Sequence, residues 1–128
     1  METQKRRIKI AIVILNWNGK DWLEKFLPTI IQYSNTAEII IANNGSSDDS
    51  LLFLSKNFPD IKVINHKENL GFAGGYNNSL DRIHAEYYVL LNSDVEVSDN
   101  WLSPIISLMD KDKDIAACQP KLLDFNNR

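Results

Sequence analysis

Short runs of branched apolar residues alternate with segments of helical periodicity along the 128-residue sequence, and this alternation limits the fold more than any other feature. Apolar runs of about four to eight residues between polar turns are typical of strands that are buried on both faces. We therefore predict five strands, at residues 8–15, 38–42, 61–64, 87–91 and 115–119.

One helical segment follows each of the first four predicted strands. The predicted helices begin near Asp21, near Leu51, near Ala73 and after Asp99. The third is expected to end near residue 84. The fourth is expected to pack through one face, formed by Trp101, Ile105 and Leu108.

Strands and helices that alternate with short connections predict a mostly parallel sheet with helices on both faces. Right-handed crossovers between parallel strands favour the strand order 3-2-1-4. The sequence therefore predicts one Rossmann-like α/β domain that covers residues 1–128.

The composition is that of a soluble globular protein, with 44% hydrophobic and 24% charged residues. The chain has a net charge of -3, whereas most nucleic-acid-binding domains carry an excess of basic residues, so no nucleic-acid partner is expected. The only cysteine, Cys118, cannot form an internal disulfide, which favours a cytoplasmic location. Its apolar neighbours predict that Cys118 is buried. His66 and His84 have no metal-binding spacing and are expected on the surface.

Polar or glycine-rich segments follow the first four predicted strands, at residues 16–19, 43–49, 65–75 and 92–94. In parallel sheets, ligands bind beyond the carboxyl ends of the strands. These four segments are therefore the candidate binding loops.

The segment Asn92-Ser93-Asp94 follows a buried strand, so the Asp94 carboxylate is expected to emerge where the strand reaches solvent. Such a carboxylate can bind Mg²⁺ or Mn²⁺, and the cation can neutralise a diphosphate. Asn92 can add a ligand or contact a ribose hydroxyl, and Glu96 offers a second carboxylate. The alternative is that Asn92-Ser93-Asp94 forms an ordinary turn, since asparagine, serine and aspartate are all common in turns.

The glycine-rich segment 69–78 leads into a predicted helix, whose free N–H groups can bind a diphosphate or a sugar hydroxyl. Gly74 and Gly75 each cost a helix about 1 kcal/mol relative to alanine, so a close ligand or tight packing must compensate. Both explanations remain open at this point.

In the segment 43–49, amide and carboxylate groups can read the edge of a nucleobase. The alternative is a capping loop, in which Asp48 or Asp49 caps the following helix. Trp17 can stack on a base or pack against its own helix.

These segments, in this order, resemble glycosyltransferase family 2, which has the GT-A fold, and especially its rhamnosyltransferase-like members. The similar segments are residues 12–19, 39–50, 69–78, 90–97 and 120–124. Residues 90–97 contain the family's metal-binding D-x-D motif in the relaxed form Asn92-Ser93-Asp94. The family usually has aspartate at the position of Asn43.

The resemblance implies an inverting enzyme that transfers a hexose from a dTDP- or UDP-linked donor to an acceptor hydroxyl, in the synthesis of cell-surface polysaccharide. The acceptor would be a saccharide or a lipid-linked molecule, with peripheral membrane association of the intact protein. Asp94 would bind Mg²⁺ or Mn²⁺. The donor would contact Asn16, Asn43, Asn44, Gly71, Asn77 and Asn92.

Family members are considerably longer than this chain, so the resemblance implies a truncated GT-A domain that binds the donor. The catalytic base is then expected beyond Arg128, and the chain alone is expected to be inactive and prone to self-association. The alternative is a non-catalytic nucleotide-binding or scaffold module of the same fold. A nucleotidyltransferase is less favoured, because no basic, glycine-rich loop follows the first predicted strand.

Overall fold

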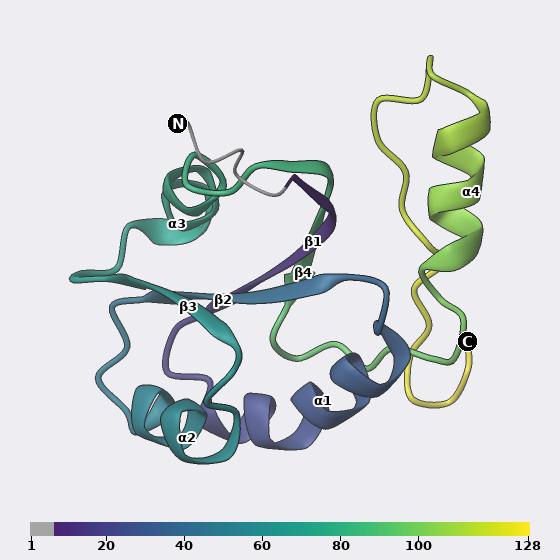
Figure 1. Ribbon diagram of the computed structural model, residues 1–128. Coiled ribbons are helices and arrows are strands. Elements are labelled where there is room, and N and C mark those ends of the chain that lie inside the picture. The colour runs from purple at the N-terminus through teal and green to yellow at the C-terminus, as the bar shows by residue number, and fades with distance from the viewer. Residues whose placement is uncertain (1–6) are drawn as a thin grey trace.

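A computed structural model of the protein describes residues 7–128, in which strands and helices alternate (Figure 1). The elements are β1 (Ile8–Asn16), α1 (Lys20–Tyr33), β2 (Glu38–Asn44), α2 (Ser50–Asn57), β3 (Lys62–His66), α3 (Gly71–Leu80), β4 (Ala85–Asn92) and α4 (Ser103–Lys111). No helix in this part of the chain is long and apolar enough to cross a membrane.

The four strands form one parallel sheet in the order β3-β2-β1-β4, which confirms the predicted topology. The register places Asn16 opposite Asn43, and Asn43 opposite Asn65. On the other side of β1, Leu15 lies opposite Asn92. The polar residues that end the strands therefore meet at one edge of the sheet.

Helices cover both faces of the sheet, with α3 on one side and α1 and α2 on the other (Figure 1). Alternate residues of β1 divide the core between these faces. Ile10, Ile12 and Ile14 pack against α1, whereas Ala11 and Val13 belong to the cluster beneath α3. All five side chains are buried, so β1 is the central strand of the core.

The predicted fifth strand, residues 115–119, does not form, and this prediction was wrong. A strand needs a hydrogen-bonded neighbour, and β4 pairs only with β1 among the described residues. The segment instead runs back beside α4 (Figure 1). Cys118 is exposed there, which also contradicts the expectation of a buried thiol.

The helices α3 and α4 differ in detail from the prediction. α3 ends at Leu80, four residues before the expected end. In α4 the buried side chain is Ile106, which packs with Leu102 one turn earlier, whereas Leu108 is exposed. The predicted face of α4 was therefore wrong for Leu108, whereas Trp101 packs against the core and Ile105 is half-buried.

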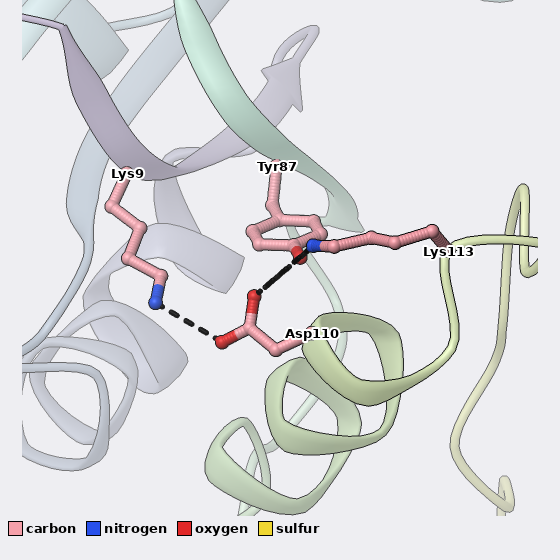
Figure 2. Close-up of polar contacts among 4 residues, drawn as sticks. All are labelled: Lys9, Tyr87, Asp110 and Lys113. Carbon is pink, nitrogen blue, oxygen red and sulfur yellow. Dashed lines mark hydrogen bonds and ion pairs between the residues drawn. The ribbon is translucent and has the colours of Figure 1, made fainter.

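A surface cluster fixes α4 to the sheet (Figure 2). The Asp110 carboxylate accepts hydrogen bonds from Tyr87 Oη at 2.5 Å and from Lys9 Nζ at 3.1 Å. Lys113 Nζ donates to Tyr87 Oη at 3.4 Å. The hydrogen bonds from Tyr87 and then Lys9 lower the pKa of Asp110. Because exposed ion pairs contribute little to stability, the cluster mainly orients α4.

Candidate functional site

Three asparagine side chains form a hydrogen-bonded row across the carboxyl ends of β1, β2 and β3. Asn16 Nδ2 donates to Asn43 Oδ1 at 3.0 Å, and Asn43 Nδ2 donates to Asn65 Oδ1 at 2.8 Å. We call Asn16, Asn43 and Asn65 the amide row. Asn16 and Asn43 are buried, whereas Asn65 is exposed. The parallel register produces the row because it aligns these three positions on neighbouring strands.

Ser46 connects the amide row to the loop that follows β1. Its hydroxyl donates to Asn43 Oδ1 at 2.6 Å and accepts from Asn16 Nδ2 at 3.1 Å and the Asn18 N–H at 2.9 Å. Asn18 Oδ1 accepts in turn from the N–H of Ser47 at 2.7 Å. The loops after β1 and β2 therefore form one polar unit.

Asp48, which lies in the loop after β2, caps the first turns of two helices. Its carboxylate accepts from the N–H of Ser50 at 3.0 Å, at the start of α2, and from the N–H of Lys20 at 3.1 Å, at the start of α1. Partial burial raises the pKa of Asp48. The hydrogen bonds from Ser50 and Lys20 together lower this pKa by more than burial raises it, so the net shift is downward. The predicted capping role therefore belongs to Asp48. Asp49 makes no side-chain capping bond.

Asn44 holds the segment that leads into α3. Its Nδ2 donates to Asn69 Oδ1 and to the Gly71 carbonyl, both at 3.0 Å, and its Oδ1 accepts from the Leu70 N–H at 3.0 Å. Asn44 is buried, so its amide is a structural link between β2 and the glycine-rich segment. Gly71 itself is exposed and adopts a φ of 76°.

Tight packing explains the second of the paired glycines. A Cβ added to Gly75 would lie 2.8 Å from Leu15 Cδ1 and 2.9 Å from Asn44 Nδ2. A Cβ added to Gly74 would meet only Leu70 Cβ, at 3.3 Å. α3 therefore crosses close to the ends of β1 and β2, and Gly75 is the residue that permits the crossing.

Gly75→Ala is expected to lower the free energy of unfolding by about 1–2 kcal/mol, because overpacking outweighs the gain in helix propensity. Gly74→Ala is the matched control and is expected to gain between zero and about 1 kcal/mol. Urea unfolding of both variants measures the difference. Equal or greater stability of the Gly75 variant would contradict the close crossing of α3.

The structure corrects the prediction that His66 lies on the surface, whereas His84 is exposed as predicted. His66 is buried, with Nε2 2.8 Å from Ser79 Oγ. The Ser79 hydroxyl donates to the Gly75 carbonyl at 2.7 Å, so it accepts from His66 Nε2–H. Burial, followed by the charge of Arg82, lowers the pKa of His66. A sequence signal for this burial exists. Side chains two residues apart on a strand lie on the same face, so His66 is expected to point to the same side as buried Ile64.

The segment after β4 lies beside the amide row. A Cβ added to Gly19 would lie 2.6 Å from Asn16 Oδ1 and 3.3 Å from Ser93 Oγ, so the two loops meet above Gly19. Asn16 Oδ1 is buried and has no hydrogen-bond partner among residues 7–128. Asn92 and Asp94, the residues on either side of Ser93, are exposed.

The oxygen groups of this loop fit a hard cation. Magnesium is commonly bound by one or two carboxylates together with substrate phosphates. Asp94 and Asn92 offer an exposed carboxylate and an exposed amide carbonyl. Within residues 7–128, no group of three or more histidine, cysteine, aspartate or glutamate side chains is gathered to hold a metal.

The predicted contact residues Asn77 and Trp17 lie outside this hydrogen-bonded network. Asn77 is exposed on α3, about 9 Å further along the helix axis than Gly71 by the helical rise. Trp17 is 58% exposed, so its ring is available for stacking. Conversely, Asn65 and Ser46 belong to the network, although neither was predicted individually from the sequence. Their signal is the position of Asn65 at the end of a strand and of Ser46 three residues after Asn43.

The sequence model described as "Glycosyl transferase family 2" matches residues 11–126. An uncharacterized glycosyltransferase of Haemophilus influenzae is 29% identical over 112 residues, covering 84% of this chain and 35% of the relative. The low-salt glycan biosynthesis hexosyltransferase Agl10 of Haloferax volcanii is 29% identical over 93 residues, covering 70% of this chain and 29% of the relative. The chain thus spans about a third of the length of these curated relatives.

A solved structure shares the fold. It is the mannosyltransferase PcManGT of Pyrobaculum calidifontis, in complex with GDP-Man and Mn²⁺. The TM-score is 0.70 at 17% sequence identity, and the match covers 82% of this chain and 33% of that chain. The predicted GT-A type of fold is confirmed by this similarity.

Proposed function

This chain belongs to glycosyl transferase family 2, and from that premise we propose that it is the donor-binding part of an inverting hexosyltransferase. The reaction moves a sugar from a nucleoside diphosphate, UDP or dTDP, to the hydroxyl of a saccharide or lipid-linked acceptor. The observation that carries the proposal is the meeting of the amide row and the Asn92–Asp94 loop at one edge of the sheet.

The donor is proposed to lie across this edge, and each group has a distinct part in holding it. Asn16, Asn43 and Asn44 form the buried floor beneath it. Asp94 holds Mg²⁺ or Mn²⁺, which would neutralise charge on the leaving diphosphate. The remaining proposed contacts come from Gly71, Asn77 and Asn92. The Mn²⁺ and GDP-Man present in PcManGT support this chemistry by similarity.

Inverting transfer also needs a general base on the side of the sugar opposite the diphosphate. We assign this role to no residue of the chain. The relatives are about three times as long, and we propose that the base and the acceptor site lie in their additional length. The chain alone is then expected to bind donor without transferring sugar. We place the reaction in the cytoplasm, in polysaccharide synthesis, with peripheral membrane association of the intact enzyme.

The test is calorimetric titration of the chain with UDP and with dTDP, first with Mn²⁺ and then with a chelator. Binding is expected only with metal, and it should be weak, because only part of the donor contacts are present. Equal heats in the two conditions would remove the role given to Asp94. Absence of binding in both would overturn the proposed function.

A further inference from the structure

The Asn16 side chain has one polar atom that the amide row leaves unpaired. Asn16 Nδ2 donates to Asn43 Oδ1 and to Ser46 Oγ, which fixes the orientation of the amide group. Its Oδ1 therefore points away from the row, and this oxygen is buried without a hydrogen-bond partner among residues 7–128. A buried carbonyl without a partner is costly, so a donor that reaches this oxygen stabilises the state in which the bond forms.

Ser93 is placed to supply that donor. Asn16 Oδ1 and Ser93 Oγ both border the space above Gly19, where an added Cβ would lie 2.6 Å from the first atom and 3.3 Å from the second. The two atoms do not form a hydrogen bond in this structure. Asn16 is 0% exposed, so a nucleotide cannot contact its Oδ1 without displacing protein atoms. Ser93 is half-buried, and it immediately precedes Asp94.

We propose that Ser93 closes the Asn92–Asp94 loop onto the end of β1 when the donor and its cation bind. The Ser93 hydroxyl then donates to Asn16 Oδ1, and this bond holds Asp94 toward the cation. This inference rests on the proposed function. Ser93 is a positioning residue, since it contacts neither the cation nor the nucleotide. Gly19 permits the closure, because a larger side chain would fill the space between the two oxygens.

The experiment measures the affinity of UDP by calorimetry with Mn²⁺, for the unaltered chain and for variants. Ser93→Ala is expected to weaken UDP binding about five- to tenfold, the value of one neutral hydrogen bond. Ser93→Thr keeps the hydroxyl and is expected to retain most of the affinity. Ser98→Ala is the matched control, because Ser98 is an exposed serine in the segment after β4, and its affinity for UDP should be unchanged.

Thermal melting without metal separates a closure from a permanent structural contact. The bond between Ser93 and Asn16 is not formed in the free chain, so metal-free Ser93→Ala is expected to melt at the same temperature as the unaltered chain. A lower melting temperature would show that the Ser93 hydroxyl stabilises the free chain, and the proposed closure would be wrong.

Gly19→Ala tests whether Ser93 acts through Asn16. Its methyl group would lie between the two oxygens, so this variant should also weaken UDP binding. In the Gly19→Ala background, Ser93→Ala should cause no further loss, because the contact is already blocked. Full additivity of the two losses would show that Ser93 does not act through Asn16.

Unchanged UDP affinity in Ser93→Ala, or an equal loss in Ser93→Thr, would overturn the role of the Ser93 hydroxyl while the proposed function stands. If the unaltered chain does not bind UDP in the presence of Mn²⁺, the proposed function fails, and this inference fails with it.

Discussion

Replacing Gly45 with alanine is expected to lower the free energy of unfolding by about 3–5 kcal/mol, a large part of the total for a domain of this size. Two costs add at this position. The φ of Gly45 is 70°, a left-handed conformation that alanine adopts only with strain. The added Cβ would also clash with the backbone carbonyl carbon of Glu68 and lie 2.6 Å from the Asn69 nitrogen. Backbone atoms cannot move aside as a flexible side chain can.

Gly71→Ala separates the two costs. Gly71 has a φ of 76°, but nothing lies within 4 Å of an added Cβ. This variant should lose only the strain, about 1 kcal/mol. Urea denaturation of both variants gives the comparison. Similar losses would show that the contact between the β2 loop and the segment before α3 is unimportant for stability.

The second large effect is expected from Asp94→Asn, which should weaken metal-dependent nucleotide binding by at least about a hundredfold. Loss of even a group that supports a metal ligand typically costs about 10- to 100-fold, and Asp94 is proposed as the ligand itself. Because Asp94 is exposed, its replacement opens no cavity, and the stability should change by no more than about 0.5 kcal/mol. Calorimetry with Mn²⁺ and thermal melting measure the two quantities.

Glu96→Gln is the matched control for Asp94→Asn, since Glu96 is an exposed carboxylate two residues later in the same loop. It should retain nucleotide binding. If both variants lose binding equally, Asp94 has no special role and the negative charge of the loop as a whole is responsible. A large drop in the melting temperature of Asp94→Asn alone would identify Asp94 as a structural residue instead.

Most of the fold could be predicted from the sequence, because each of β1 to β4 contains a run of mostly apolar residues. The predicted burial on both faces was wrong for β4, in which Tyr88 and Leu90 are exposed, because β4 pairs only with β1 among the described residues. The strand ends were harder to predict. All four strands continue into polar residues, namely Asn16, Asn44, His66 and Asn92. Ladder pairing is made by the backbone, so it does not stop where the apolar side chains stop.

The contents of the candidate site could be predicted only in part. Its position followed from the topology, because ligand sites of parallel sheets lie at the carboxyl ends of the strands. The link between Asn43 and Asn65 depends on the strand register, which no local pattern in the sequence specifies. The fifth strand was predicted wrongly for the opposite reason, because there the local sequence pattern is present and the pairing is not. Residues 115–119 have the apolar run of a strand, but pairing depends on a neighbour and not on the run itself.

The sheet order also determines when the protein can fold during its synthesis. β1 is made first, yet its partner β4 follows much later, since Ile10 pairs with Tyr87, about 77 positions further along the chain. A ribosome adds about 5–20 residues per second, so β1 waits several seconds for this partner. Meanwhile β1 pairs with β2 alone, and its other side offers a free row of backbone groups. The nascent chain is therefore most exposed to pairing with other chains, and most dependent on chaperones, before residue 92 leaves the ribosome.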